Sequence, residues 1–393
     1  MLPLFVTGYT VVCAPSHGRK ALISALRNHQ GGLHKNAFGP AKLQTYIGEV
    51  MGIDAVDLPA SLISYDCRNN RLAEMALLQD DFIDQVGDLK QRVESPRIGL
   101  FLGTTTSGTL GSEEAYRIQQ TTSCFPKEYQ YKKTHDLYSL TEYIKKRLDI
   151  HGPSFTVSTA CSSSAKVFCE ATRFIATGFC DAAIVGGVDT LCYNTLFGFN
   201  SLQLISKDKC CPFDTNRSGI SIGEAGGFMI LEKTHHNSSR VMLEGFGESS
   251  DAHHISTPHP EGTGAIKAIN EALQRAKLSH ADITYVNLHG TATLSNDISE
   301  AAAVSSIFTK DTICSSTKGW TGHTLGAAGI VEAVISCICL EEQFIPGTLN
   351  SKEPDETLDI NLAIKLQQKN YSHTLSNSFG FGGTNCSLIF GRI

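Results

Sequence analysis

The same local design occurs once in each half of the chain: an apolar strand, a turn of small and hydroxyl residues, and then a helix of small and aliphatic residues. In the first half the strand is 154–158 and the turn contains Cys161. In the second half the strand is 311–316 and the turn contains His323. Strands that lead into helices in this way are typical of α/β folds with mostly parallel sheets. The repetition predicts two related α/β halves.

The length also favours two packed units, because 393 residues exceed one ordinary core of roughly 100–200 residues. A polar stretch at 232–240 separates two strand-like runs near the midpoint. We therefore predict an N-terminal half over 1–236 and a C-terminal half over 237–393. The segment within about 104–150 is partly charged and aromatic, and we predict that it forms an insertion over the rim.

The composition is that of an ordinary globular chain, with 41% hydrophobic and 18% charged residues. A net charge of −6 argues against a nucleic-acid surface and against general attraction to anionic lipid. No apolar run reaches the ~18 residues of a membrane helix. The apolar first residues lack the basic region of a signal peptide. We therefore expect no nucleic-acid partner and no membrane insertion.

Thirteen cysteines, an odd number without regular spacing, predict reduced thiols in a cytoplasmic protein. Cys161 differs from the others because it lies where a strand turns into a helix. Unpaired N–H groups at a helix start stabilise a thiolate. A small packed side chain is the alternative, and it is the one we expect for most of the other cysteines. The position of Cys161 favours a nucleophile that is ionised at neutral pH.

Two histidines and a glycine-rich turn are further candidates. His289 follows the strand 285–288 and opens a Gly/Thr loop, a place where α/β sheets bind ligands. His323 lies at a helix start with Lys318 five residues before it, although it could simply cap that helix. The glycine-dense segment 377–385 could point N–H groups at an anion, or form a tight turn before the last strand.

Together these segments resemble the β-ketoacyl-[acyl-carrier-protein] synthases of the two-histidine class. They occur in the family order and extend over most of the chain. The resemblance implies a duplicated thiolase-like α/β fold, layered α-β-α-β-α with two mixed sheets. The matching blocks are STACSS at 158–163, PFDTNRSG at 212–219, GEAG at 223–226, HGTAT at 289–293, Lys318 with GHTLGAAG at 322–329, and FGFGGTN at 379–385.

The resemblance implies an acyltransferase that performs decarboxylative Claisen condensation by a ping-pong route, in fatty-acid or polyketide synthesis. Cys161 would hold an acyl chain as a thioester, and the enolate of a malonyl carrier would attack it. His289 and His323 would donate N–H groups to the enolate oxygen. No metal or organic cofactor is implied, since the substrates are carried on the phosphopantetheine of acyl carrier protein.

The resemblance assigns supporting roles as well. Lys318 would hold His323 in position and maintain the local charge. Glu300 would support the site without contacting the reacting groups. The N–H groups of Cys161 and Phe381 would form an oxyanion hole, with the Phe381 ring as a gate. The remaining assignments are Thr291 and Thr293 for the pantetheine amides, and Thr109 and Phe379 for the acyl pocket.

The implied partners are acyl carrier protein and a second subunit, which gives either a homodimer or a heterodimer with a Cys-less chain-length-factor homologue. Because the carrier is acidic, we expect a local basic patch despite the negative net charge. An ordinary solvated face is the alternative for each basic residue. The candidates are Arg68, Arg71, Lys127, Lys132 and Lys133.

Two positions depart from the family pattern, namely Leu294 in place of a usual proline and Ser218 in place of an acidic residue. The segments 103–110 and 136–143 are more polar than we expect beside a saturated chain. This favours a polyene or aryl-headed substrate, as in aryl-polyene synthesis. A solvated rim is the alternative explanation for these residues.

Two other functions remain open, a non-catalytic partner subunit of a synthase and a hydrolytic Cys/His enzyme. The retained Cys161 argues against the first, because the inactive partners lack that thiol. The histidine doublets 235–236 and 253–254, with His259 nearby, lack the fixed ligand spacing of a metal site. We therefore predict that the chain has no metal site.

Overall fold

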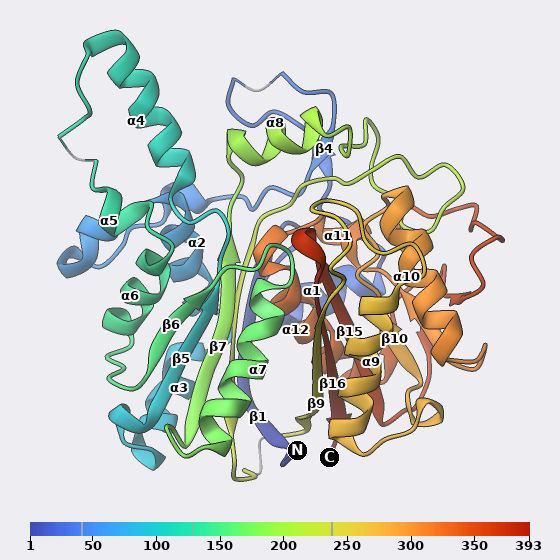
Figure 1. The fold of residues 1–393 in the computed structure, drawn as a ribbon. Helices are drawn as coiled ribbons and strands as arrows, with labels where there is room; N and C mark the ends of the chain where they lie inside the picture. The colour runs from blue at the N-terminus through green and yellow to red at the C-terminus, as the bar shows by residue number, and fades with distance from the viewer. Residues whose placement is uncertain (41, 128, 237–238) are drawn as a thin grey trace.

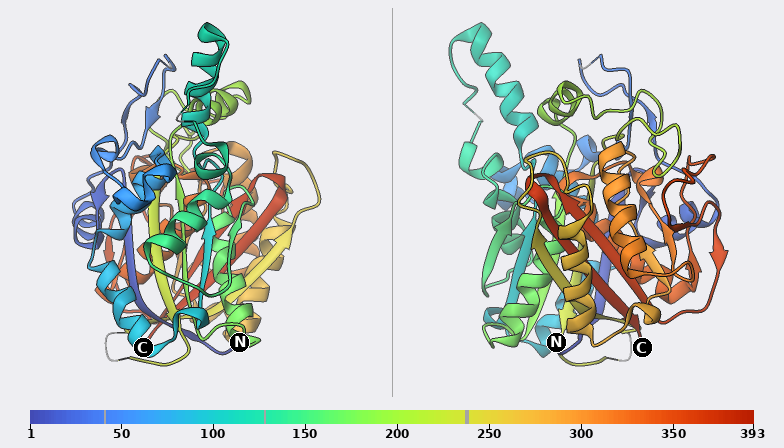
Figure 2. Two further views of the ribbon diagram at one scale, coloured as in Figure 1. Left: turned by 90° about the vertical axis from the view of Figure 1, so that its left-hand side faces the viewer. Right: turned by 45° about the vertical axis from the view of Figure 1, so that its right-hand side comes forward.

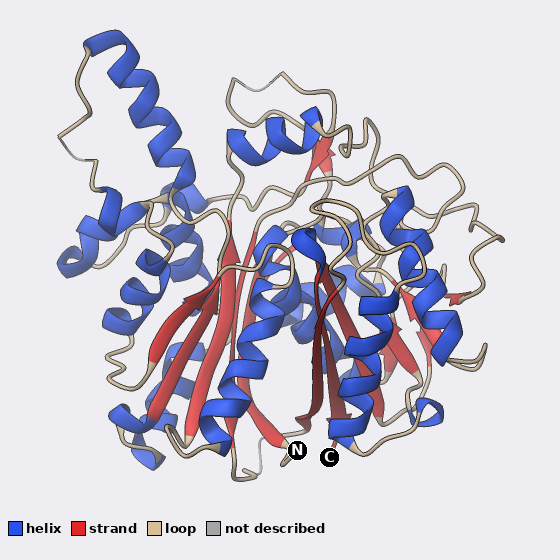
Figure 3. Cartoon of the chain, viewed as in Figure 1, coloured by secondary structure: helices blue, strands red, loops and turns tan. Residues whose placement is uncertain are grey.

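The computed structural model describes residues 1–40, 42–127, 129–236 and 239–393. Its described strands build a large mixed sheet of 12 strands, in the order β13-β11-β10-β15-β16-β9-β1-β8-β7-β5-β6 with β2 paired to β1 (Figure 1, Figure 3). The bounds are β1 (Leu4–Cys13), β2 (Ser16–His17), β5 (Ile98–Gly103), β6 (Ser154–Val157), β7 (Ala182–Asp189), β8 (Ala225–Glu232), β9 (Val241–Ser250), β10 (Tyr285–Asn287), β11 (Ile313–Ser315), β13 (Asn361–Leu362), β15 (His373–Gly380) and β16 (Thr384–Arg392).

The strand pairing is the same on both sides of the centre of the sheet. β5 is parallel to β6 and β7, and β10 is parallel to β11 and β15. β8 and β16 then run antiparallel to their neighbours. At the centre, β1 and β9 join through three residue pairs that involve Leu4, Phe5 and Val6. The strands thus form one hydrogen-bonded path, where we expected two mixed sheets.

Helices α7 (Ser163–Ala176) and α12 (Ala328–Glu342) contact each other and strands from both sides of this centre. Every residue of α12 from Ala328 to Leu340 is buried. A helix that is apolar on all sides is stable only when protein surrounds it, which explains why its sequence lacks a polar face. Its one buried acidic residue, Glu332, therefore requires a specific partner.

The other helices cover the outer faces or lie at the rim (Figure 1, Figure 2). α2, α3 and α6 contact β8, β1 and β5, and α9 contacts β9 and β16, with α10 against α9. The bounds are α1 (Arg19–Arg27), α2 (Arg68–Leu77), α3 (Phe82–Arg92), α4 (Thr109–Thr122), α5 (Tyr131–Thr134), α6 (Tyr138–Arg147), α8 (Tyr193–Ser201), α9 (Thr263–Ala276), α10 (Leu294–Ile307) and α11 (Lys318–Thr321), with the short pairs β3 (His34–Lys35)/β4 (Tyr46–Ile47) and β12 (Phe344–Ile345)/β14 (Gln367–Gln368).

The segment that we predicted as a rim insertion has two parts. α4 projects from the body and exposes Tyr116 and Ile118 (Figure 2). In contrast, α6 packs on β5 and β6, and its side chains Leu140 and Tyr143 are buried. The predicted boundary between 236 and 237 adjoins residues 237–238, which lie outside the described residues.

Two further observations concern the thiols and the helix lengths. All thirteen cysteines are free thiols. Within the described ranges, no helix is long and apolar enough to cross a membrane.

Candidate active site

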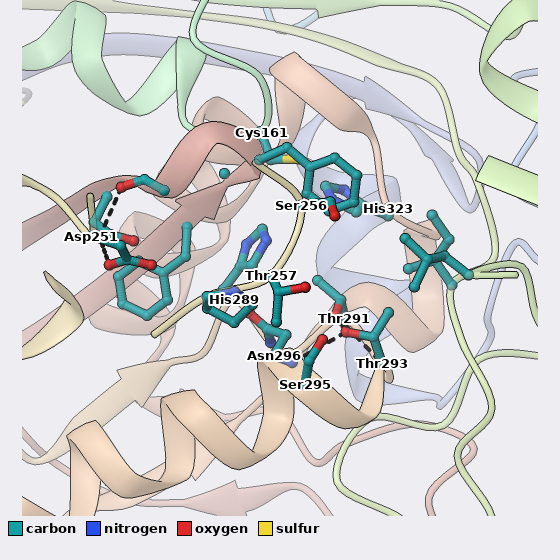
Figure 4. Close-up of a pocket in the computed structure, with 18 of the residues that line it drawn as sticks. Cys161, Asp251, Ser256, Thr257, His289, Thr291, Thr293, Ser295, Asn296 and His323 are labelled. Atoms are coloured by element: carbon teal, nitrogen blue, oxygen red, sulfur yellow. Dashed lines mark hydrogen bonds between the residues drawn. The ribbon is translucent and has the colours of Figure 1, made fainter. Parts of the chain in front are cut away.

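Cys161, His289 and His323 come from three turns that are distant in the sequence, and they meet in one pocket (Figure 4). The Cys161 sulfur and one nitrogen from each imidazole lie within 4.8 Å of one another. The two rings are nearly perpendicular, with centroids 5.2 Å apart. All three side chains are buried. The convergence that the sequence pattern predicted is therefore present, and the three turns follow β6, β10 and β11.

The Cys161 turn is a sharp elbow between β6 and α7. Ala160 has a φ of 51°, a left-handed conformation that is uncommon for a residue with a Cβ. The elbow is held by the hydroxyl of Ser163, which donates to the Ala160 carbonyl at 2.6 Å and accepts from the Thr159 N–H at 2.9 Å. Gly329 lets α12 approach this helix, since a Cβ there would lie 2.4 Å from the Ala165 nitrogen.

The protonation state of Cys161 differs from our expectation. Burial raises the pKa of the Cys161 thiol to about 11, although Lys318 and the Phe381 backbone N–H act to lower this pKa. We had expected the helix start to ionise the thiol at neutral pH. Removal of the sulfur from water is the larger effect here, because burial disfavours the charged form. The resting side chain is therefore a thiol.

Alkylation of Cys161 should accordingly be slow at neutral pH and rise with pH. With a pKa near 11, the thiolate fraction increases about tenfold per pH unit over the range below that value. The measurement is the rate of iodoacetamide incorporation at Cys161 between pH 7 and 10, followed by mass spectrometry of the Cys161 peptide. A rate that levels off near pH 7 would contradict the buried-thiol description.

Both imidazoles have a defined tautomer. The Leu325 N–H donates to Nδ1 of His323 at 3.3 Å, and the Lys318 ammonium, which has only donors, contacts Nδ1 of His289 at 3.3 Å. In each neutral ring the proton is therefore on Nε2. Burial, together with the charge of Lys318, holds the pKa of both histidines well below the usual value. At neutral pH the site thus contains two uncharged N–H donors.

The same tautomers bear on metal binding. Among the described residues, Cys161, His289 and His323 are the one group of three donors close enough to share an ion. A metal requires an unprotonated ring nitrogen, whereas Nδ1 of both rings accepts a hydrogen bond and Nε2 carries the proton. The arrangement therefore suits hydrogen-bond donation better than coordination.

Lys318 contacts a different histidine from the one we expected. We had assigned it to His323, but its ammonium bonds to Nδ1 and the carbonyl oxygen of His289 and forms an ion pair with Glu332. Burial raises the pKa of Glu332 to about 7, and the nearby Lys318 acts against this rise. Sequence reasoning missed Glu332, although a single acid in the apolar run 327–340 was a visible signal.

Glu300 holds the turn that carries His289. Its two carboxylate oxygens accept from the backbone N–H groups of His289 and Gly290, both at 2.8 Å. Asn377 on β15 donates to the same carboxylate at 3.1 Å. Burial raises the pKa of Glu300 to about 7, while these donors act to lower it. Glu300 thus bonds to the backbone of the turn that carries His289, and its supporting role in the reaction stays a prediction.

Asp189, which we did not predict, connects two loops of the site. It accepts from the hydroxyls of Thr104 and Thr106, at 2.7 and 2.9 Å, and from the Gly326 N–H at 2.6 Å. The Thr105 N–H also donates to it at 2.7 Å. These hydroxyls are thus used inside the protein. The polar character of 103–110 does not by itself indicate a polar substrate.

The hydroxyls of the segment 136–143, the other polar segment that favoured an aryl or polyene substrate, also form hydrogen bonds within the protein. The Thr141 hydroxyl lies 2.7 Å from that of Thr156, and the Tyr143 hydroxyl donates to Glu74 at 2.6 Å. Neither the first nor the second segment therefore leaves its buried hydroxyls free to select an aryl or polyene chain.

The remaining predicted residues divide between the pocket and its surroundings. The backbone N–H of Phe381 lies in hydrogen-bond contact with the Cys161 thiol, and its ring centroid lies 5.4 Å from that of Phe199. Thr291 and Thr293 line the pocket with their hydroxyls 2.9 Å apart. Phe379 also lines it, whereas Thr109 begins α4 and donates to the Thr106 carbonyl.

The five predicted docking residues are in different environments. The Arg68 side chain is only 7% exposed and forms an ion pair with Glu224 at 2.6 Å, so this guanidinium faces inward. Arg71 forms an ion pair with Asp66, and Lys133 donates to Ser64. The exposed members of the set are Lys127 and Lys132.

Two family models match adjoining parts of the chain. The family model described as "Beta-ketoacyl synthase, N-terminal domain" matches residues 77–237, and "Beta-ketoacyl synthase, C-terminal domain" matches residues 241–352. The chain is 36% identical over 261 residues to 3-oxoacyl-[acyl-carrier-protein] synthase 2 of Vibrio harveyi, which covers 62% of this chain and 63% of that protein. A mitochondrial 3-oxoacyl-[acyl-carrier-protein] synthase of Arabidopsis thaliana is 38% identical over 274 residues, 64% of this chain and 59% of that protein. The matches thus span less than two thirds of these relatives.

Among solved structures, the chain is similar over its whole length to a ketosynthase (ApeO) in complex with its chain length factor (ApeC) from Xenorhabdus doucetiae. The identity is 37%, the TM-score is 0.92, and the match covers 98% of that chain. The ishigamide ketosynthase/chain length factor has the same fold, with a TM-score of 0.89 at 23% identity and 99% of that chain covered. The two domain matches, the full-length similarity and the Cys-His-His site together show that the chain belongs to the β-ketoacyl synthase family.

Proposed function

We propose that the chain is a β-ketoacyl-[acyl-carrier-protein] synthase, an acyltransferase that forms a carbon–carbon bond between two thioesters. The observation that carries this proposal is the pocket in which one thiol faces two neutral imidazoles, each with its proton on Nε2. A thiol suits covalent storage of an acyl group, and paired N–H donors suit a developing oxyanion.

In the first half-reaction, the Cys161 sulfur attacks the carbonyl carbon of an acyl thioester. A new sulfur–carbon bond forms at Cys161, the bond to the carrier sulfur breaks, and the carrier leaves as a thiol with the proton from Cys161. The backbone N–H groups of Cys161 and Phe381 would bind the tetrahedral oxyanion. The contact between the Phe381 N–H and the thiol supports this placement.

In the second half-reaction, a malonyl thioester loses carbon dioxide and its two bonding electrons form an enolate. The Nε2–H groups of His289 and His323 would donate to the enolate oxygen, so that no strong base is needed. The enolate carbon then attacks the acyl thioester carbon, and the Cys161 sulfur leaves as a thiolate that takes up a proton from solvent. The products are a β-ketoacyl carrier, carbon dioxide and the free enzyme thiol.

The substrates would enter on a phosphopantetheine arm past Thr291 and Thr293. Their hydroxyls lie at the pocket, where they can donate to or accept from amide groups. The roles of Phe379 beside the acyl chain and of the Phe381 ring as a gate follow from the same positions. Thr109, at the first residue of α4, stays a prediction for the acyl pocket.

The proposed reaction is tested with purified chain, an acyl carrier substrate and malonyl carrier. The expected result is release of one carbon dioxide per β-ketoacyl carrier formed, and absence of this product would overturn the proposal. Saturated and aryl-enoyl carriers offered in parallel test the aryl-polyene pathway. Equal or better transfer of the saturated chain would exclude that pathway.

We place the reaction in the cytoplasm, where free thiols stay reduced.

We also propose a second subunit, either another copy or a Cys-less chain length factor. In the described residues, β6 pairs on one side only and leaves an open sheet edge. The neighbouring insertion exposes Tyr116, Phe125 and Tyr131. Apolar exposure beside an open edge favours association with another chain. The similar ketosynthase from Xenorhabdus doucetiae forms a complex with its chain length factor.

We propose that basic residues of the insertion attract the acidic carrier. These residues are the exposed Lys127 and Lys132, with Lys133 beside them. The double variant Lys132→Glu/Lys133→Glu should raise the KM for carrier substrates severalfold, because the carrier is acidic. Alkylation of Cys161 should be unchanged in the same variant. Identical carrier kinetics in the variant and the parent chain would remove these two lysines from the docking surface.

We further propose that 1–236 and 237–393 are duplicated halves in an α-β-α-β-α arrangement. The support is the correspondence of β6, β5, β7, β8 and β1 with β11, β10, β15, β16 and β9, in order and in direction. The contacts of α7 and α12 with both sets agree with a central helical layer. The family matches also meet between 237 and 241.

A further inference from the structure

The first turn of α8 is capped by a carboxylate from another helix. The two oxygens of Glu113, on α4, accept the backbone N–H groups of Tyr193 and Asn194 at 2.9 and 2.5 Å. The first N–H groups of a helix have no partner within it, and a negative charge beside them is favourable. α4 and α8 contact each other at the upper side of the molecule in Figure 1. Glu113 thus connects the projecting insertion to α8.

α8 does not supply this cap itself. In the described residues at the start of the helix, the side chain of the N-cap residue Cys192 forms no capping hydrogen bond. Its sulfur lies 3.4 Å from the Thr195 hydroxyl, which donates to the Cys192 carbonyl at 3.0 Å. The first turn, 193–195, contains no acidic residue. The carboxylate that this helix start favours therefore comes from Glu113, 80 residues before Tyr193.

A second residue of α4 holds the same end of α8. The guanidinium carbon of Arg117, one turn after Glu113, lies 4.4 Å from the centre of the Tyr193 ring. A cation over an aromatic face is attracted to it. The Tyr193 ring also packs against Phe38, with centroids 5.7 Å apart. The start of α8 is thus fixed by a hydrogen-bonded carboxylate and by a stacked guanidinium.

The other end of α8 forms part of the active-site pocket. Phe199, in the last turn of the helix, lines the pocket, and its ring centroid lies 5.4 Å from that of Phe381. The Phe381 N–H in turn contacts the Cys161 thiol. Leu196, between the two ends of α8, is fully buried. Because α8 is a single helix of 9 residues, the fixed start determines where Phe199 lies.

We propose that Glu113 is a positioning residue for the acyl-transfer half-reaction, because it fixes α8 so that Phe199 packs against Phe381 in the pocket of Cys161. This inference rests on the proposed function and deepens it. Phe199, Phe381 and Cys161 line the same pocket. An acyl chain that is attached to the Cys161 sulfur therefore meets a wall that α8 supplies.

The malonyl half-reaction depends on other contacts. Lys318 bonds to Nδ1 of His289, and the Leu325 N–H donates to Nδ1 of His323. These partners lie outside α4 and α8. The two half-reactions should therefore respond differently to the loss of the Glu113 carboxylate.

The test measures both half-reactions in Glu113→Ala. In a ping-pong route, kcat/KM for the acyl carrier reports acylation, and kcat/KM for the malonyl carrier reports the second half-reaction. The expected result is an about fivefold lower kcat/KM for the acyl carrier, the size of a lost helix cap, and an unchanged kcat/KM for the malonyl carrier. Glu113→Gln should fall between the parent and Glu113→Ala, since its amide has one acceptor oxygen for two N–H groups.

Glu114→Ala is the matched control, because Glu114 is the neighbouring exposed acid on α4. It removes the same charge from the same helix, and neither kcat/KM value should change. A double-mutant cycle then tests whether Glu113 acts through Phe199. In a Phe199→Leu background, the added Glu113→Ala should cause little further loss for the acyl carrier.

Hydrogen exchange tests the cap without the reaction. In Glu113→Ala, the N–H groups of Tyr193 and Asn194 should exchange faster than in the parent chain, because they lose their acceptor. In Glu114→Ala they should exchange at the parent rate. An unchanged exchange rate in Glu113→Ala would overturn the inference.

Equal losses for both carriers in Glu113→Ala would also overturn it, as would an unchanged value for the acyl carrier or an additive loss in the Phe199→Leu background. An equal effect of Glu114→Ala would show that charge on α4 is responsible instead of the cap. Failure of the proposed function has a different signature. In that case the parent chain would give no β-ketoacyl product, while exchange at the start of α8 would still respond to Glu113→Ala.

Discussion

Replacement of Cys161 by alanine is expected to reduce condensation by ~10³-fold or more, because the covalent acyl intermediate cannot form without the sulfur. The measurement is β-ketoacyl carrier formed from acyl and malonyl carriers, together with the mass of the protein after incubation with acyl carrier alone. The parent chain should gain one acyl group at Cys161, and Cys161→Ala should gain none. Decarboxylation of malonyl carrier should persist in Cys161→Ala, since the two histidines are unchanged.

Cys169→Ala is the matched control for this experiment. Cys169 is also buried and lies on the same helix α7, but its sulfur faces that of Cys386 at 3.6 Å in the core. Its removal should leave acylation and condensation largely intact. Normal condensation by Cys161→Ala would exclude the covalent route. An absence of acylation in the parent chain would favour the non-catalytic subunit that the sequence left open.

The second large effect is expected for His289→Asn and His323→Asn, each of which should slow malonyl decarboxylation by about 10²–10³-fold. Each imidazole donates from Nε2 because its Nδ1 already accepts a hydrogen bond. An asparagine amide is too short to reach the Nε2 position, so one donor to the enolate oxygen is lost. The measurement is release of labelled carbon dioxide from malonyl carrier.

The same variants separate condensation from hydrolysis. Acylation of Cys161 should continue in both variants, because it does not require an enolate. His253→Asn is the control, since His253 is exposed on the loop at the entrance and does not line the pocket. Full decarboxylation by His323→Asn would show that its assignment is wrong. Loss of thioester cleavage without loss of decarboxylation would instead favour a hydrolase.

The positions of the reacting residues could be predicted from the sequence, because a strand, a turn and a helix form a local pattern. A residue directly after a parallel strand lies at the carboxyl edge of the sheet, whatever the rest of the chain does. Cys161 follows β6 and His289 follows β10, and these strands run parallel to their neighbours. Their meeting in one pocket depends on how the two parts of the sheet pack, because five antiparallel pairings separate β6 from β10 along the strand order.

The hydrogen-bond and ion-pair partners of charged and polar side chains could not be predicted from the sequence, because these partners lie far away along the chain. Arg68 pairs with Glu224, 156 residues later, and the hydroxyl of Thr104 bonds to Asp189, 85 residues later. A basic residue and a threonine-rich turn therefore suggested docking and substrate contact. Their side chains instead satisfy buried carboxylates, which require such partners.

The sequence by itself determined which groups can react: one cysteine and two histidines at the ends of strands, in the order of a known family. Only the tertiary structure decided their protonation and their neighbours. Burial of Cys161 raises its pKa to about 11 in spite of the helix start, and Lys318 lies against His289 instead of His323. The local sequence pattern determines at which turn a side chain is attached. Its desolvation and its hydrogen bonds depend on every segment that packs around it.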